Sequence, residues 1–178
     1  MINDYETNTS TSSSGEGFNQ SSSTVSNDDA ISKLNDLIEI CKDGQNGFKE
    51  AAEGIEDSGL KSTFYEYSQQ RSEFVGTLQE LVRSLGGDPE QSGSVSGAVH
   101  RAWIDIKSAV TGKDDEAILN ECERGEDYAK SAYKDACAVD MPSNVANVIQ
   151  EQAAKVQEAH DHIKQLRNSR RASSSTSA

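Results

Sequence analysis

Proline is scarce in this sequence, and neither of its two prolines interrupts a stretch with helical periodicity. Pro89 and Pro142 both fall between such stretches. Runs of β-branched residues with alternating polarity, the usual sign of strands, are also missing. Apolar residues instead recur at helical spacing over about 140 of the 178 residues. The sequence therefore predicts an all-α protein with almost no strand.

Long apolar runs are absent as well. No stretch approaches the ~18 consecutive apolar residues of a membrane-spanning helix. The first residues, Met1–Glu6, lack the basic and apolar segments of a secretory signal. Cys41, Cys122 and Cys137 show no paired spacing, so they indicate neither a disulfide framework nor a zinc motif. We therefore expect a cytoplasmic protein whose cysteines stay reduced.

Basic residues are outnumbered, with 17 Lys and Arg against 30 Asp and Glu and a net charge of -13. Such a chain repels the phosphates of nucleic acids and the headgroups of anionic membranes. The charges are spread along helix faces, which is typical of a solvated surface that keeps a protein soluble. We expect no nucleic acid and no membrane among its partners, and a homo-oligomer or a protein partner instead.

Four long segments each carry a ladder of apolar residues at alternating spacings of four and three, which is typical of helices packed in a bundle. The second ladder consists of Leu60, Phe64, Tyr67, Arg71, Phe74, Leu78, Leu81 and Leu85. The others cover residues 34–55, 119–136 and 145–166. Each ladder has one polar residue near its middle, namely Gln45, Arg71, Glu126 and Gln152. The pattern predicts a four-helix bundle with a buried polar layer.

The breaks between the apolar ladders give the expected bounds of the helices. Helices are predicted over residues 28–56, 60–85, 114–138 and 142–168. The flanking segments 1–27 and 169–178 are rich in Ser and Thr and bury too little apolar surface to offset the entropy of an ordered chain. We therefore predict two disordered arms on either side of a bundle domain that spans residues 28–168.

The connection between the second and third helices is much longer than a hairpin needs. It includes an amphipathic stretch over residues 92–112, and a helix of ~18 residues spans ~27 Å, about the length of a bundle. Such a crossover makes the second and third helices parallel, which is the ferritin-like arrangement. We expect Trp103, with His100 close before it, to anchor the crossover on the bundle.

The polar layer occupies the place where ferritin-like proteins hold two iron ions. Such sites take a Glu from each of two helices and a Glu-x-x-His from each of the other two. Here Gln45 and Gln152 are amides, and the guanidinium of Arg71 is always charged and cannot bind a cation. We therefore expect no cofactor. We predict instead that Arg71 pairs with Glu126 and that the two amides complete the hydrogen bonds.

A metal site with fewer ligands is the alternative. Glu123 and Glu126 share a face of the third helix, and His160 lies beside the ladder of the fourth. Together they could bind iron or another divalent ion. However, His160 is eight residues from Gln152, or ~12 Å along the helix axis. A single site that uses both the central layer and His160 is therefore strained.

Four short segments occur together in this sequence: Gly86–Pro89, Gly97–Trp103, Glu121–Asp127 and Ala159–Asp161. Their combination resembles a bacterial family of uncharacterised four-helix-bundle proteins related to ferritins, over about residues 31–168. The resemblance implies a ferritin-like fold but no activity, because that family is known mainly as a domain of unknown function. The Glu-x-x-His ligands of ferritins and rubrerythrins are missing, so ferroxidase or peroxidase activity is not implied.

Three functions follow as hypotheses. The one we favour is a non-catalytic bundle that acts by self-association or partner binding, with a stress-response role suggested only by analogy with ferritin-like relatives. The second is a metal-binding redox protein that uses carboxylate and His ligands on the third and fourth helices. The third is a module that its Ser-rich arms tether to a larger assembly.

Overall fold

A computed structural model describes residues 26–89, 106, 108–112 and 114–176 of the chain. Its long helices are α1 (Asn27–Gly54), α2 (Ser58–Ser84), α4 (Asp115–Cys137) and α5 (Ser143–Thr176). Residues 106 and 108–111 are helical too, and no strand occurs within the described ranges. The predicted all-α class is confirmed. None of the described helices is long and apolar enough to cross a membrane.

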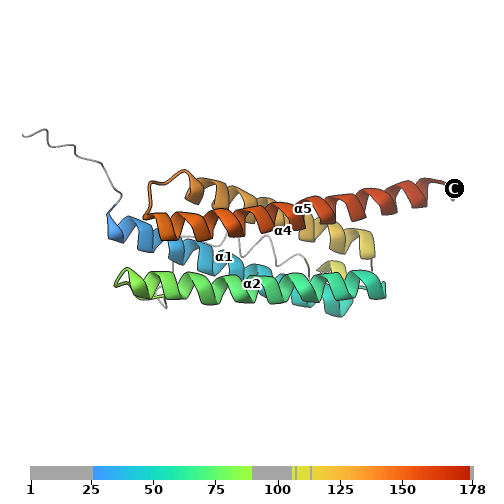
Figure 1. Cartoon of the computed structure of the whole chain (residues 1–178). Coiled ribbons are helices and arrows are strands. Elements are labelled where there is room, and N and C mark those ends of the chain that lie inside the picture. Colours follow the sequence, from blue (N-terminus) through green and yellow to red (C-terminus); the bar gives the residue numbers. More distant parts are fainter. Residues whose placement is uncertain (1–25, 90–105, 107, 113, 177–178) are drawn as a thin grey trace, which may run out of the picture.

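The helices form two antiparallel pairs, α1 with α2 and α4 with α5, which lie side by side (Figure 1). Contacts at the helix ends give the directions between the pairs. The Glu56 amide after α1 donates to Asp115 at the start of α4, at 3.2 Å. Arg170 near the end of α5 pairs with Asp57 just before α2, at 3.0 Å. Helices α2 and α4 therefore run in the same direction, as the long connection predicts.

Both described ends of the α2–α4 connection lie against α1. Near the start of α1, Asn35 Nδ2 donates to the carbonyl of Asp88 at 3.2 Å. At its end, Gly54 packs so closely against Val110 that a Cβ on the glycine would clash with the valine. The connection therefore enters at one end of α1 and leaves at the other. The expected anchors His100 and Trp103 lie outside the described residues.

Side-chain caps set the starts of three helices. Ser26, Asp57 and Asp114 accept hydrogen bonds from first-turn amides of α1, α2 and α4, and each such cap typically contributes about 1 kcal/mol. After α2, Gly86 has a φ of 83°, a left-handed conformation that glycine adopts without strain. The helices therefore begin and end within a few residues of the predicted breaks, except at the end of α5.

The apolar ladders form the core, with one local shift. The ladder positions of α4 are buried, and those of α5 are buried except for the last one. On α2, Ser68 and Val82 are buried, whereas the predicted positions Tyr67 and Leu81 are only partly buried. A straight α-helix drifts against a strict seven-residue repeat. At two turns of α2 the residue after the predicted position is therefore the buried one, whereas Leu60, Phe64, Arg71, Phe74 and Leu78 are buried as predicted.

The last helix is longer than predicted. It continues to Thr176, beyond the expected end at Asn168 and into the segment 169–178 that we predicted to be disordered. That prediction is wrong for most of the segment. Arg170 pairs there with acidic side chains next to the starts of α2 and α4. These ion pairs to distant residues help to hold the final turns of α5. The sequence of those turns offers no apolar face that could pack on the bundle.

Candidate functional site

The predicted ion pair lies in the centre of the bundle. Arg71 Nη2 on α2 donates to Glu126 Oε2 on α4 at 2.6 Å, and the two side chains are 1% and 0% exposed. Aromatic rings accompany the guanidinium, whose Cζ is 5.8 Å from the centroid of Phe48 and 5.3 Å from that of Phe74. Rings placed in this way stabilise a cation away from water. The pair links two helices that lie diagonally across the bundle.

The Arg71–Glu126 contact compensates only part of the cost of burying the two charged groups. Burial raises the pKa of Glu126, and the charge and hydrogen bond of Arg71 oppose that rise. Arg71 Nε and Glu126 Oε1 are buried without a hydrogen-bond partner among the described residues. A buried pair that is only partly satisfied adds little net stability, although removing one partner is costly. The pair is therefore better suited to fixing how the helices fit together than to strengthening the fold.

A second chain of polar groups runs through the same region. Tyr133 Oη on α4 donates to Gln152 Oε1 on α5 at 2.7 Å and lies 3.2 Å from Cys41 Sγ on α1. Because the phenol gives its only proton to the amide, the thiol donates to the phenol oxygen. Burial raises the pKa of Cys41 to about 11 and that of Tyr133 well above its ordinary value. The ladder pattern places these residues in the core, but it predicts no polar role for Cys41 or Tyr133.

The prediction for Gln45 needs correction. Its side chain is partly buried, and its main-chain carbonyl accepts a hydrogen bond from Ser68 Oγ at 2.8 Å. The preceding Gly44 faces the stem of the Arg71 side chain instead, since a Cβ there would lie 3.5 Å from Arg71 Cγ. Gln70 supplies an amide, because its Oε1 accepts from Arg71 Nη1. The long arginine side chain fits beside a glycine, and the next position of α1 is rotated away.

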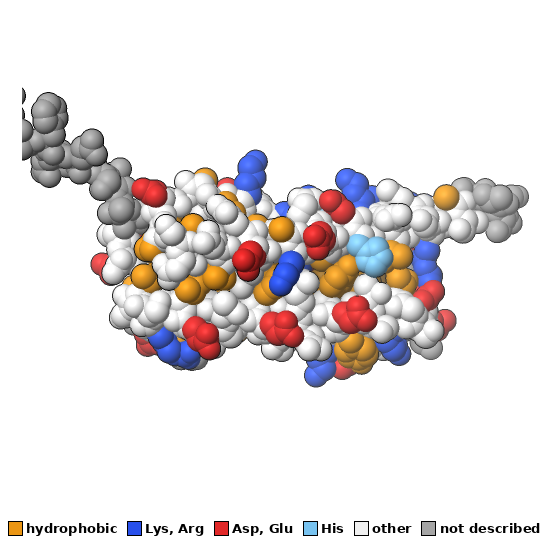
Figure 2. Space-filling model, in the orientation of Figure 1, with side chains coloured by type: hydrophobic (Ala, Val, Ile, Leu, Met, Phe, Trp, Pro, Cys, Tyr) orange, Lys and Arg blue, Asp and Glu red, His pale blue; other side chains and the backbone are white. Residues whose placement is uncertain are grey.

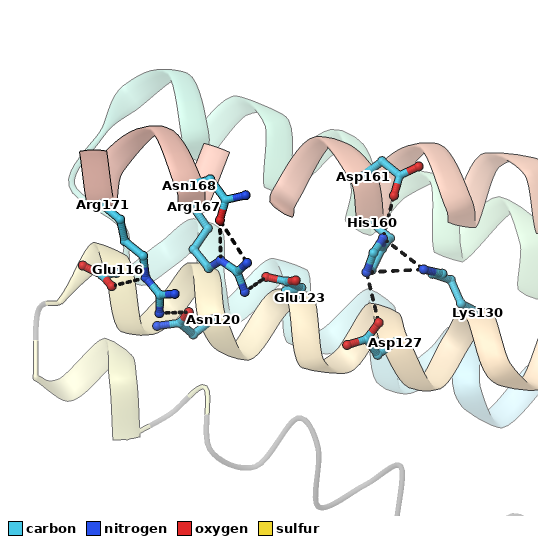
Figure 3. A network of polar contacts seen from close by, with 10 residues as sticks. All are labelled: Glu116, Asn120, Glu123, Asp127, Lys130, His160, Asp161, Arg167, Asn168 and Arg171. Carbon is cyan, nitrogen blue, oxygen red and sulfur yellow. Dashed lines mark hydrogen bonds and ion pairs between the residues drawn. The ribbon is translucent and has the colours of Figure 1, made fainter. Parts of the chain in front are cut away.

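A ladder of polar contacts joins α4 to α5 beside the core (Figure 3). Arg167 pairs with Glu123. Arg171 Nε donates to Glu116 at 2.7 Å, and its Nη2 donates to Asn120 at 3.1 Å. The acceptors on α4 follow the same spacing of four and three as the apolar ladder. That spacing, with two arginines four residues apart on α5, is the sequence signal from which these contacts could have been predicted.

His160 lies further along this interface and is buried between two carboxylates (Figure 3). Its Nε2 is 3.0 Å from Asp127 Oδ1, and its Nδ1 is 2.9 Å from Asp161 Oδ1. Lys130 Nζ is 3.2 Å from the same Nδ1. Hydrogen bonds from Gln157 and then His160 lower the pKa of Asp161. The imidazole is therefore held by its own neighbours at the edge of the bundle.

The three residues considered as metal ligands do not converge on one point. Glu123 pairs with Arg167, Glu126 pairs with Arg71, and His160 lies between its two aspartates. Across the described ranges, no group of three or more His, Cys, Asp or Glu side chains is placed to hold a metal ion. An arginine beside each glutamate also raises the electrostatic cost of bringing a cation there.

Helices α2 and α5 make less contact than the other neighbouring pairs, and long side chains bridge them. Tyr67 Oη is 2.7 Å from His162 Nδ1. A second bridge lies seven residues after Tyr67 on α2 and seven residues before His162 on α5. There, Lys155 Nζ lies 5.9 Å from the centroid of the Phe74 ring. The Tyr67–His162 contact is exposed, and polar contacts at the surface contribute little to stability. This side of the bundle is therefore held less firmly than the others.

One more step of seven residues on each antiparallel helix leads to Leu81 on α2 and to Val148 on α5. Both side chains are hydrophobic and partly buried. Figure 2 shows hydrophobic side chains along the line between the two helices, with basic and His side chains among them. We name this surface the α2–α5 seam and define it by Tyr67, Phe74, Leu81, Val148, Lys155 and His162.

A sequence profile of the family described as Domain of unknown function (DUF2383) matches residues 29–139 of the chain. The match includes all but the first two residues of α1, the whole of α2 and α4 and the Arg71–Glu126 pair, and it stops before α5. No curated protein sequence matches the chain. The polar partners on α5, including Gln152 and His160, therefore lie outside the matched region.

Proposed function

We propose that this chain, which belongs to the family described as Domain of unknown function (DUF2383), is a non-catalytic helical bundle that acts by binding other protein chains. These chains are further copies of itself or a different protein. The observation that carries the proposal is the Arg71–Glu126 ion pair at the centre of the bundle. In a ferritin-like arrangement, which the parallel α2 and α4 support, this is where two metal ions would lie.

The ion pair favours a structural use of the polar layer over a chemical one. Arg71 keeps its charge at every accessible pH, and Glu126 gives one carboxylate oxygen to it. Buried ionic groups of this kind can specify one helix register at little gain in stability. The layer then holds the bundle in one arrangement, and function resides on its surface.

The surface offers contact area for another chain. The α2–α5 seam lies between two weakly contacting helices, where Tyr67, Leu81 and Val148 are only partly buried. Tyr65 and Tyr128 are 45% and 41% exposed on α2 and α4. Tyrosine is enriched in protein interfaces because it combines a large apolar area with a polar end. These features support a binding role, and we place it in a stress response only by analogy with ferritin-like proteins.

Two measurements test this function. Sedimentation velocity of the full chain over a broad concentration range should show reversible association, or a defined complex once a partner is added. Elemental analysis after anaerobic loading with Fe(II) should give less than one iron per chain, without ferroxidase activity. Two bound irons per chain would favour the metal-binding redox alternative. A chain that is monomeric throughout, whatever protein is added, contradicts the proposed role.

A further inference from the structure

Two rows of exposed glutamates flank the α2–α5 seam. On α2, each glutamate immediately precedes a residue of the seam. On α5, each glutamate lies three residues after a residue of the seam. Both rows repeat every seven residues, as the seam itself does. The five glutamates are Glu66, Glu73, Glu80, Glu151 and Glu158.

One glutamate of each row lies close enough to Tyr67 of the seam to influence its phenol electrostatically. Burial raises the pKa of Tyr67 to about 12; the charge of Glu126 adds to this rise and that of Arg71 opposes it, and Glu66 and Glu158 add smaller contributions. These two residues belong to different helices, and both act on the phenol that bridges to His162. The seam therefore has an apolar floor, two bridging basic side chains and an acidic rim on each side.

An apolar stripe flanked by charges at seven-residue intervals is the pattern by which helices select one another. We propose that the α2–α5 seam binds an amphipathic helix of a partner protein, whose apolar stripe is bordered by Lys and Arg. This inference rests on the proposed binding function and specifies its surface and its partner. The incoming helix displaces the Lys155 and His162 side chains and covers Phe74 and Leu81.

Charge decides which occupant fits. A second copy of this chain carries the same acidic rows and a net charge of -13, so docking seam to seam would bring like charges together. A helix with basic borders places its cations opposite both rims. The complex then gains from apolar burial on the floor and from charge complementarity at the edges, and the latter also raises the rate of encounter.

The probe is a designed helical peptide of about three heptads with leucine at the a and d positions and lysine at e and g. A second peptide has the same apolar stripe and glutamate at e and g. Fluorescence anisotropy measures the binding of each labelled peptide to the full chain at low and high salt. We expect the lysine peptide to bind at least tenfold more tightly than the glutamate peptide, and the difference to shrink as salt rises.

Matched variants test the location. One carries Glu66→Gln, Glu73→Gln and Glu80→Gln on the rim. The control removes the same number of exposed carboxylates elsewhere, by Glu53→Gln, Asp135→Asn and Asp140→Asn. We expect the rim variant to bind the lysine peptide about tenfold more weakly than the control variant does. All substituted side chains are exposed, so circular dichroism melts should show both variants folded.

Each other outcome overturns the seam proposal. Equal weakening by both variants would mean that the net charge, and not the seam, attracts the peptide. No binding of the lysine peptide would exclude a basic helix as the partner. The full chain could also associate with itself in the absence of peptide. If the rim variant, and not the control variant, abolishes or strengthens that association, the seam binds a second copy of the chain. Sedimentation of the full chain tests the broader function separately, so that function survives if only the seam fails.

Discussion

Arg71 on α2 and Glu126 on α4 form a buried ion pair between two parallel helices that lie diagonally across the bundle, with 2.6 Å between Nη2 and Oε2. Because neither helix packs directly on the other, the pair ties together the α1–α2 and α4–α5 hairpins. A shift of either hairpin by one turn would separate the two charges in a medium that cannot solvate them. The pair therefore selects one alignment of the two halves.

The first prediction concerns this pair. Arg71→Met and Glu126→Leu should each lower the free energy of unfolding by about 3–5 kcal/mol, because each leaves a buried charge without a partner. The double variant should recover most of the loss, since two apolar residues of similar volume need no partner. Urea melts of the three variants and the parent chain give the coupling energy. Simple addition of the two single losses would show that the residues act independently.

Two glycines of α1 provide the second prediction. Gly44→Ala should raise the free energy of unfolding by about 0.5–1 kcal/mol, because its Cβ meets Arg71 only at ordinary contact distance and alanine favours the helix. Gly54→Ala should lower it by about 1–3 kcal/mol, since its Cβ would overlap Val110. Denaturant melts of both variants check this. Similar shifts of the same sign would show that the Gly54–Val110 contact is unimportant.

A third prediction follows from the buried thiol. The pKa of Cys41 is raised from 9.0 to about 11, so the folded protein holds this proton more tightly than the unfolded chain. The corresponding stability is fully present below pH 9 and is lost as the pH rises towards 11, at about 1.4 kcal/mol for each unit of difference. Between pH 8 and pH 10.5 the parent chain should therefore lose more stability than Cys41→Ala does.

The exposed Cys137 offers the comparison for this experiment. Partial burial raises the pKa of Cys137 too, so Cys137→Ala should lose less stability than the parent chain over the same pH range but more than Cys41→Ala does. Parallel curves for Cys41→Ala and the parent would contradict the assignment. In the folded protein, a thiol reagent should modify Cys137 rapidly and the buried Cys41 and Cys122 only after unfolding, because the thiolate is the reactive form.

The fourth prediction concerns the end of α5. A chain that ends at Asn168 loses Arg170 and Arg171, whereas one that ends at Ala172 keeps both. The shorter chain should be about 1 kcal/mol less stable at low salt, because these ion pairs are partly exposed and each contributes a modest amount. The difference should fall in concentrated salt. Thermal melts of both truncated chains at two salt concentrations decide whether the ion pairs hold the final turns.

Several features of this protein are determined by its sequence alone. The spacing of apolar residues defines the helices, because burial of one stripe along a helix needs a repeat near 3.6 residues. The length of the connection after α2 is enough to set the parallel course of α2 and α4. The positions of Arg71 and Glu126, both midway along apolar ladders, predict that they pair, since leaving either charge buried without a partner is costly.

Only the tertiary structure decided which other polar groups meet. Gln70 replaces Gln45 beside Arg71, and Tyr133 joins Cys41 to Gln152, because partner choice depends on how each helix is rotated about its axis. That rotation is set by the packing of all the helices together, so it cannot be predicted from the apolar ladder of a single helix. The same holds for the last turns of α5. Their composition predicts disorder, whereas ion pairs and a hydrogen bond to distant parts of the chain help to hold them as a helix.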